Sequence, residues 1–386
     1  MATFAQGKIE AYVGPAELGA TDSLESVIVG FIGEARKTLD IAVQELDNQV
    51  IAQAILDAAL RGVRVRAFFE QDYLKADNPP RLKSGSDQAD EQARYDAQWN
   101  ERRRPVSRKT NRDILAALLR CSVDVRADLN PEIFHQKFIV RDYRGGRSLG
   151  RAALLTGSTN FTSTGCHNNL NHVLVFNDYR VCRPYAAEFE ELVDGTFGAT
   201  RHRKRVFPRT ANINGVPVRV VFSPDDAPEL EIIKQMLKAR KRVDFAVFTF
   251  SGSSGIDDAM IMLRKADIRL QGVVDRLQGG RDWAASRWLH NEGIDVYLSD
   301  RDKLPGLGKL HHKLMVIDDA IVVAGSMNYT QPANDYNDEN VFVIGSPYDL
   351  PKGKGGPVDH QECKRIAEFF RLEVERIVSF STRFES

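Results

Sequence analysis

The sequence predicts an α/β protein of two similar halves, related by a pseudo-two-fold axis, each a mixed, largely parallel sheet with helices on both faces. Three observations support this fold class. The chain has 386 residues, enough for two cores of ordinary size. The stretch ARKTLDIAV at 35–43 returns as ARKRVDFAV at 239–247. In both halves apolar strands alternate with amphipathic helical stretches, which is typical of βαβ units.

The expected elements follow the same order in the two halves. In the first half they are a helix at 23–36, a strand at 39–43, a helix at 51–61, strands at 63–69 and 122–129, and a closing stretch YAAEFEELVDGTF at 185–197. Their counterparts in the second half are 228–240, 243–248, 256–265, 268–274, 293–300 and 362–378. Each third strand runs into a histidine motif, described below.

The boundary between the halves is expected in the basic segment TRHRKRVFPRT, so that the halves cover 1–205 and 206–386. The first half also carries a polar insertion at about 75–112, with the basic cluster ERRRPVSRK at 101–109. This insertion is either a solvated excursion or a lip that contacts the substrate, since such insertions on an α/β scaffold often border the active site.

Composition is that of a soluble globular protein, with 42% apolar and 27% charged residues. No apolar run reaches the length of a membrane span, and the N-terminal residues do not resemble a secretory signal, so a cytoplasmic location is expected. The formal net charge is zero, so attraction to a polyanion must come from local clusters. The four cysteines lack metal-binding spacing and indicate reduced thiols.

One motif, His-x-Lys-x4-Asp, occurs twice. Residues 135–142 read HQKFIVRD and residues 311–318 read HHKLMVID. The spacers are mainly apolar, as in a buried strand. Period-two alternation then places the histidine and lysine of each copy on the same face of that strand.

Each motif is followed by a second matching segment. Residues 157–160 are Gly-Ser-Thr-Asn and residues 325–328 are Gly-Ser-Met-Asn. Asn171 and Glu339 then stand at corresponding positions, at the start of the apolar stretches NHVLVF and ENVFVI. Two motifs with matching flanks are very hard to reach by chance.

These paired segments resemble the phospholipase D superfamily over nearly the whole chain. In that family the two motifs meet at the interface between the halves and form one site. The resemblance implies a two-step displacement through a covalent phosphohistidine, without a metal or another cofactor. The other histidines show no metal-ligand spacing; they are His167, His172, His202, His290 and His360.

The residue types suit phosphodiester chemistry. One neutral imidazole can attack phosphorus while a second, charged imidazole donates a proton to the leaving oxygen. Lys137 and Lys313 are expected to hold the phosphoryl oxygens, supplying the charge that a metal supplies elsewhere. The side chains expected to help bind the phosphate are Ser158, Asn160, Ser326 and Asn328.

The roles of the two histidines follow from the residues at 171 and 339. The resemblance implies that Glu339 orients the histidine of its own motif, His311, and a carboxylate partner favours the charged proton donor. Asn171, where many members have an acid, would leave His135 neutral as the nucleophile. The reverse assignment stays open. Two further motif residues, Asp142 and Asp318, lie beyond the lysines at a strand end and are expected to support the structure.

The mechanism does not choose the substrate. A nuclease, with DNA favoured, is the main hypothesis, because the basic clusters at 102–104 and 201–205 can bind phosphates. The alternative is a phospholipase D or phosphatidyltransferase that acts on phospholipid head groups, although no interfacial amphipathic helix is evident. A binding module without activity is disfavoured, since both His-Lys pairs are intact. Both motifs are on one chain, so a monomer suffices for one complete site.

Overall fold

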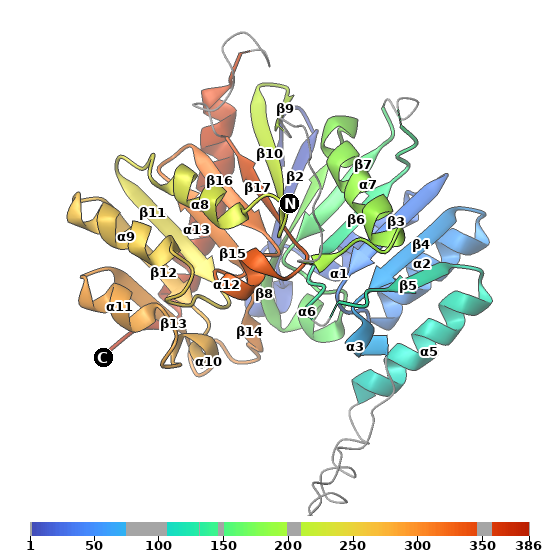
Figure 1. Cartoon of the computed structure of the whole chain (residues 1–386), viewed down its shortest axis with the longest axis horizontal. Coiled ribbons are helices and arrows are strands. Elements are labelled where there is room, and N and C mark those ends of the chain that lie inside the picture. Colours follow the sequence, from blue (N-terminus) through green and yellow to red (C-terminus); the bar gives the residue numbers. More distant parts are fainter. Residues whose placement is uncertain are drawn as a thin grey trace, which may run out of the picture.

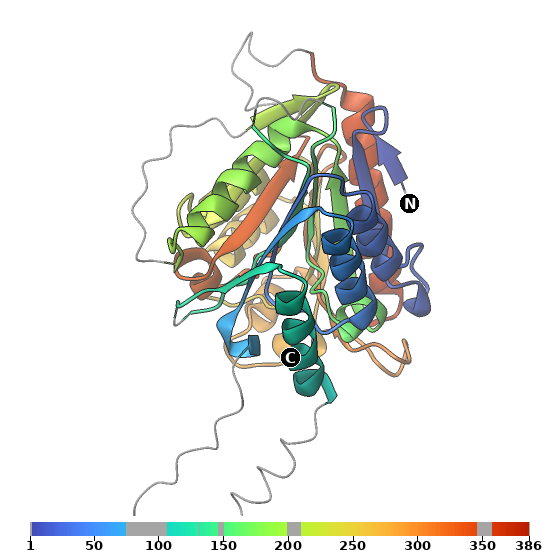
Figure 2. The same cartoon turned by 90° about the vertical axis from the view of Figure 1, so that its right-hand side faces the viewer.

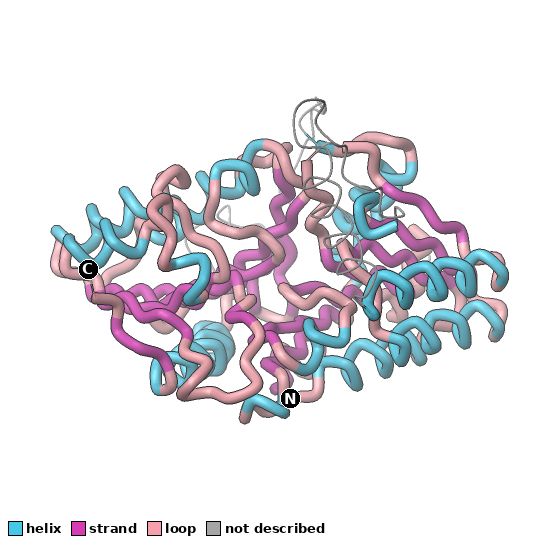
Figure 3. The backbone as a smooth tube through the Cα atoms, turned by 90° about the horizontal axis from the view of Figure 1, so that it is seen from below, coloured by secondary structure: helices cyan, strands magenta, loops and turns pink. Residues whose placement is uncertain are grey.

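The computed structural model describes residues 2–74, 106–130, 132–145, 150–198, 210–345 and 357–385. The described residues form two nine-stranded sheets side by side, flanked by helices (Figure 1). Seen from below, the strands cross the middle of the molecule and the helices lie mostly outside them (Figure 3). The predicted α/β architecture of two halves is therefore confirmed. The predicted basic clusters at 102–104 and 201–205 lie outside the described residues, and the position of the boundary stays a prediction.

The strands of the two sheets correspond. In spatial order the first sheet contains β1 (Ala2–Phe4), β2 (Ile9–Gly14), β8 (Asn169–Phe176), β7 (Ala153–Gly157), β6 (Lys137–Arg141), β3 (Thr38–Val43), β4 (Arg64–Phe69) and β5 (Asp124–Ala127). The second contains β18 (Ser381–Arg383), β13 (Asp295–Ser299), β12 (Arg269–Val274), β11 (Arg242–Val247), β15 (Lys313–Ile317), β16 (Ile321–Gly325), β17 (Glu339–Ile344), β10 (Val216–Ser223) and β9 (Thr210–Ile213). One short strand of the second half, β14 (Lys309–Leu310), pairs with β8 of the first sheet.

The pairing is mixed, as predicted, but mainly antiparallel rather than largely parallel. Within each half, the described parallel pairs join only β3, β4 and β5, or β11, β12 and β13. The motif strands instead run antiparallel to both neighbours. The reason is the chain connection: β15 and β16 are joined by a tight turn, which is too short for a parallel crossover.

The outer faces of the sheets carry separate sets of helices. The first set is α1 (Leu24–Gly33), α2 (Gln49–Leu60), α3 (Gln71–Leu74), α5 (Val106–Arg120) and α6 (Ser163–His167), preceded by the 3₁₀ turn η1 (Ala16–Leu18). The second set is α8 (Pro228–Met236), α9 (Ile256–Lys265), α10 (Arg276–Gly279), α11 (Ser286–Asn291) and α12 (Gln331–Asp335). None of the helices among the described residues has both the length and the apolar character needed to cross a bilayer.

Two further helices lie on the inner faces. These are α7 (Tyr179–Val193), which packs on β6, β7 and β10, and α13 (His360–Ser379), which packs on β11, β16 and β1. Figure 2 shows α7 on the opposite side of the first sheet from α1 and α2. The helix α7 contains most of the stretch at 185–197 that ends the first half, and it begins at Tyr179 because the side chain of Asp178 caps its first turn by accepting from the Arg180 N–H.

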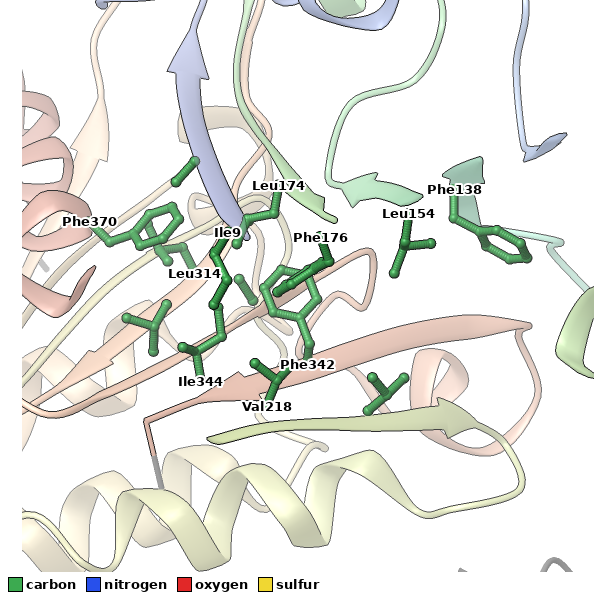
Figure 4. Packing of buried hydrophobic residues seen from close by; sticks show 14 of the residues in the cluster. Ile9, Phe138, Leu154, Leu174, Phe176, Val218, Leu314, Phe342, Ile344 and Phe370 are labelled. Atoms are coloured by element: carbon green, nitrogen blue, oxygen red, sulfur yellow. The ribbon is translucent and has the colours of Figure 1, made fainter. Parts of the chain in front are cut away.

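The inner faces share one hydrophobic core that joins the halves (Figure 4). Phe176 of β8 and Phe342 of β17 meet edge to face, with ring centroids 5.9 Å apart. Both rings are fully buried, and each such burial stabilises the fold by about 1.5–3 kcal/mol. This contact between the inner faces of the two sheets, here called the seam, also includes Phe138 of β6 and Leu314 of β15, so both motif strands pack into it.

Candidate active site

The seam brings both His-Lys pairs into one site. The rings of His135 and His311 have centroids 6.5 Å apart and planes inclined by 70°. Lys137 and Lys313 are the first residues of β6 and β15, and each side chain is only 1% exposed. The four side chains that the sequence predicted to act together are thus neighbours.

Backbone contacts across the seam fix both histidines. The His135 N–H donates to the Asp338 carbonyl at 3.0 Å, and the His311 N–H donates to the Leu170 carbonyl at 2.9 Å. Each acceptor belongs to the opposite half. The separation of the two histidines therefore depends on how the halves dock, and not on either sheet alone.

The partners of the imidazoles also cross the seam. His135 Nδ1 lies 2.7 Å from Glu339 Oε2, and His311 Nδ1 lies 3.0 Å from Asn171 Oδ1. The expected pairing of Glu339 with its own motif histidine is therefore wrong. Within one sheet β16 separates the strand of Glu339 from the motif strand, whereas the seam places Glu339 beside the motif of the other half.

These contacts define which ring nitrogen is available. The Asn171 amide nitrogen donates to the Gly165 carbonyl at 2.9 Å, so its oxygen faces His311 and the ring donates from Nδ1. The Glu339 carboxylate likewise accepts from Nδ1 of His135. In both neutral rings this leaves Nε2 with a free lone pair.

The serines of the two Gly-Ser-x-Asn segments have a different role from the one predicted. Ser158 donates to Asn171 Oδ1 at 2.7 Å, and Ser326 donates to Glu339 Oε2 at 2.6 Å. Both serines are fully buried. Because a hydroxyl has one proton, neither serine can also donate to a phosphate. They orient the partners of the histidines instead of binding the phosphate.

The glycines of these segments are required by a close approach of two strands. A Cβ on Gly157 would lie 2.2 Å from the His172 carbonyl oxygen, and one on Gly325 would lie 2.2 Å from the Asn340 carbonyl oxygen. The strand pairs β7–β8 and β16–β17 therefore come together at positions where only glycine fits.

Replacing Gly325 with alanine is expected to push β17, and with it Glu339, away from the site. We expect the free energy of unfolding to fall by about 1–3 kcal/mol, measured by urea denaturation, because added volume strains a packed core. Gly30→Ala is the control: its Cβ in α1 meets no atom within 4 Å. Equal stability of the two variants would contradict this account.

The asparagines of the same segments lie near the site at intermediate exposure. Asn160 Nδ2 lies 3.5 Å from Gln44 Oε1. In the described part of the chain, the side-chain oxygens of Asn160 and Asn328 are buried without a hydrogen-bond partner. Their predicted role in binding phosphate stays a prediction.

The two lysines are buried cations. Lys137 Nζ donates to the His135 carbonyl at 2.7 Å and to Gln44 at 3.1 Å, and Lys313 Nζ donates to the His311 carbonyl at 2.9 Å. Burial lowers the pKa of Lys137 to about 7, although Glu339 opposes the shift. Burial, and then Lys137, hold the pKa of Lys313 well below its usual value. An anion between these lysines would favour their charged forms.

Burial also keeps the imidazoles neutral. The pKa of His135 lies well below its usual value because of burial and then the nearby charges of Lys137 and Lys313. Burial lowers the pKa of His311 in the same way, helped by the two lysines. The pKa of Glu339 is raised to about 8 by burial, against the opposing effect of Lys137.

The aspartates that end the motifs lie far from this chemistry. Asp142 accepts from the backbone N–H groups of Arg36, Lys37 and Thr38, at the far end of β6. Asp318 makes the same three contacts at the far end of β15, with the N–H groups of residues 240–242. Each carboxylate ties the motif strand to the loop that begins the neighbouring strand.

Sequence reasoning missed a buried polar layer directly behind the histidines. His312 Nδ1 lies 3.1 Å from His172 Nδ1, and at the corresponding place Asn340 Nδ2 donates to Gln136 at 2.8 Å. Each of these four residues directly follows one of the site residues His135, Asn171, His311 and Glu339. Their matching positions in the two halves could therefore have indicated this layer. Among the described residues, no group of three or more His, Cys, Asp or Glu side chains could hold a metal ion.

The chain is similar to known proteins. A family model described as the phospholipase D-like domain of cardiolipin synthase matches residues 28–193 and 232–352, which is well over half of the chain. The mitochondrial cardiolipin hydrolase of Xenopus laevis is 28% identical over 118 residues, covering 31% of this chain and 53% of the relative. Phospholipase D of Rickettsia conorii is 29% identical over 127 residues, covering 33% and 60%.

The chain thus spans between half and two thirds of the length of these curated relatives. Among solved structures, the phosphatidylserine synthase of Haemophilus influenzae aligns with 100% of this chain and 88% of its own at a TM-score of 0.62. Its 11% sequence identity shows a likeness of fold alone. Given the family model and the paired motifs, the chain belongs to the phospholipase D superfamily.

Proposed function

We propose that the chain is a phosphodiesterase that cleaves phospholipid head groups through a covalent intermediate on His135. The observation that carries the proposal is the joint burial of two neutral imidazoles and two lysines in one site. Two positive charges without a bound anion are costly in such a place. A phosphodiester group supplies the missing negative charge and presents phosphorus to a nucleophile.

In the first step, His135 Nε2 attacks phosphorus, the P–N bond forms and the P–O bond to the leaving group breaks. His311 donates its Nε2 proton to that oxygen; the charge of the bound phosphodiester raises the pKa of His311 enough for it to carry this proton. In the second step, His311 takes a proton from water, the oxygen of water attacks phosphorus and the P–N bond breaks. The electron pair returns to His135.

The assignment of roles is the one expected from the sequence, but the reason for it changes. An imidazole that receives a phosphoryl group becomes positively charged. This charge lowers the pKa of Glu339 from about 8, and the ionised carboxylate, 2.7 Å from Nδ1 of His135, stabilises the charged ring. The partner of His311 is the neutral amide of Asn171, which stabilises imidazolium less and so favours release of the proton. The carboxylate therefore supports the nucleophile and not the acid.

Several observations favour phospholipid over the nucleic acid that the sequence suggested. The relatives are named for cardiolipin and phospholipid reactions. On the His311 side the ring of Phe248, with its centroid 5.0 Å from the imidazole, gives the site an apolar wall. Gln44 takes the corresponding place on the His135 side. The Gln44 N–H donates to the Gln136 carbonyl, just as the Phe248 N–H donates to the His312 carbonyl.

The test offers the protein cardiolipin vesicles and phosphatidylcholine vesicles, and in parallel labelled single- and double-stranded DNA and RNA, all in EDTA. Products are identified by mass spectrometry. Release of head groups or cleavage of cardiolipin, with intact nucleic acid, is the expected result. Cleavage of nucleic acid alone would replace this proposal with the nuclease hypothesis, and no cleavage of any substrate would overturn hydrolysis.

Anion binding is expected to weaken as the pH rises. The pKa of Lys137 in the empty site is about 7, so above pH 7 an anion must bind together with a proton. The Kd for inorganic sulfate, which itself does not titrate here, is expected to rise above pH 7 by about tenfold per pH unit for each lysine that takes up a proton on binding. Isothermal calorimetry in buffers of different ionisation enthalpy measures both the affinity and the proton uptake. A Kd that is constant between pH 7 and 9 would contradict the prediction.

A further inference from the structure

Each motif histidine is preceded by a backbone N–H that donates to a buried carboxylate. The Phe134 N–H donates to Glu70 Oε2 at 2.6 Å, and the Leu310 N–H donates to Asp275 Oδ2 at 3.0 Å. Phe134 directly precedes His135, and Leu310 stands in the same place in the second half. Neither carboxylate was singled out from the sequence.

The two carboxylates occupy corresponding positions in the fold. Glu70 directly follows β4 and Asp275 directly follows β12, which are the middle strands of the parallel part of each sheet. Their second oxygens also do the same thing: Glu70 Oε1 accepts from the Asp72 N–H at 3.1 Å and Asp275 Oδ1 from the Leu277 N–H at 3.0 Å. A contact that recurs in both halves, although one residue is Glu and the other Asp, indicates a shared requirement.

Burial of both carboxylates costs free energy, because it removes their charge from water. Glu70 is 4% exposed and Asp275 is 3% exposed. Burial raises the pKa of Glu70 to about 7 and also raises the pKa of Asp275. A buried carboxyl that only capped the following turn could be replaced by an exposed cap such as Ser or Asn. An exposed cap, however, could not also accept from the backbone N–H of the residue before a motif histidine.

The next backbone N–H in each half, that of the motif histidine, points toward the opposite half. As described above, the N–H groups of His135 and His311 themselves donate across the seam. Two consecutive N–H groups therefore tie each histidine to its own sheet through the carboxylate and to the opposite half through a carbonyl. Releasing the first tie would remove the hydrogen bond that joins the backbone ahead of each histidine to its own sheet, and it would leave the hydrogen bond across the seam in place.

We infer that Glu70 and Asp275 are positioning residues that fix the backbone ahead of His135 and His311 and so set the separation of the two rings. This inference rests on the proposed function, because the separation matters for a reaction that needs both imidazoles at one phosphorus. Neither carboxylate is assigned contact with the substrate. Each acts through the main chain of the residue before the histidine.

The test uses Glu70→Gln and Asp275→Asn. An amide has one acceptor oxygen, so one of the two N–H groups now meets an amide nitrogen, which cannot accept a hydrogen bond. The matched control is Asp178→Asn. Asp178 also accepts from the N–H two residues on, Arg180 at 2.8 Å, but it lies beyond the far end of β8.

Two readouts separate positioning from a general loss of structure. The first is the proton resonance of Nδ1–H of His135, hydrogen-bonded to Glu339 and identified by its absence in His135→Ala. It is expected to shift in Glu70→Gln and to stay in place in Asp178→Asn. The second is a fall in kcat of about 10- to 100-fold with KM nearly unchanged, because misplacement of reacting groups by a fraction of an ångström costs rate rather than affinity. Thermal unfolding shows that each variant is folded.

The outcomes are distinguishable from failure of the proposed function. The resonance needs no substrate, so it tests the inference even if the wild-type protein cleaves none of the phosphodiesters offered. A wild-type enzyme that is active, with Glu70→Gln matching Asp178→Asn in both the resonance and kcat, would overturn the inference and leave the function standing. A shift in the resonance with a lowered kcat supports both.

Discussion

Replacing His135 with alanine is expected to abolish turnover and the covalent intermediate together. The imidazole is the only group assigned to attack phosphorus, and loss of a nucleophile of this kind costs about 10⁴- to 10⁶-fold in rate. The measurement is a rapid quench with a substrate labelled on phosphorus, in which a phosphohistidine is recognised as acid-labile label on the protein. Label is expected on the wild-type protein and none on His135→Ala.

His311→Ala is the informative partner of this variant. With a p-nitrophenyl phosphodiester, whose leaving group needs no proton, the first step is expected to proceed. The second step then stalls because no base activates water, so label accumulates. His360→Ala, at an exposed position at the start of α13, is the control and keeps full activity. Label on His135→Ala but not on His311→Ala would reverse the two roles.

Replacing Lys137 with methionine is expected to lower activity while raising stability. The ammonium group is assigned to the phosphoryl oxygens, and loss of one such donor costs about 10²- to 10³-fold in rate. Methionine has a similar length and no charge to bury. We expect a net gain of about 1–3 kcal/mol in the free energy of unfolding at pH 6, after the loss of the hydrogen bond to the His135 carbonyl.

The pH dependence of this gain has a definite sign. Between the folded pKa of Lys137, about 7, and the higher pKa of a lysine in the unfolded chain, the unfolded state binds more protons. The wild-type protein therefore gains stability as the pH rises through this window, whereas the methionine variant does not gain from this residue. The advantage of the variant should be full below pH 7 and shrink toward pH 10, as followed by urea denaturation.

Lys265→Met is the control for surface effects. This lysine of α9 has a side chain that is 67% exposed, so its removal should change stability little at any pH. If Lys137→Met were less stable than wild type at pH 6, with no trend between pH 7 and 10, the view of Lys137 as a costly buried cation would be wrong. A fall in activity would then reflect loss of structure.

Much of the site could be predicted because the motif is duplicated. The positions of Lys137 and Lys313 follow from strand alternation, which is a local property of the chain. The partners of the histidines could not be predicted in the same way. Which half Glu339 faces depends on how the two sheets dock, and docking is set by side chains such as Phe176 and Phe342 that are far away in the sequence.

The wrong prediction for the serines has a similar cause. Ser158 and Ser326 carry hydroxyls in a motif shared with a phosphate-handling family, so a phosphate contact was the natural hypothesis. Their real partners, Asn171 and Glu339, become neighbours only when β7 pairs with β8 and β16 with β17. A hydroxyl already donating at 2.6–2.7 Å has no proton left for a ligand.

The crossed partners of the two histidines also bear on the direction of the reaction. A site with perfect two-fold symmetry would accept a phosphodiester in two opposite orientations and cleave either of its ester bonds equally well. Here the symmetry is broken where Asn171 faces His311 and Glu339 faces His135. In the proposed mechanism this difference between an amide and a carboxylate gives the site a polarity, with attack on phosphorus from the His135 side and departure of the alcohol on the His311 side.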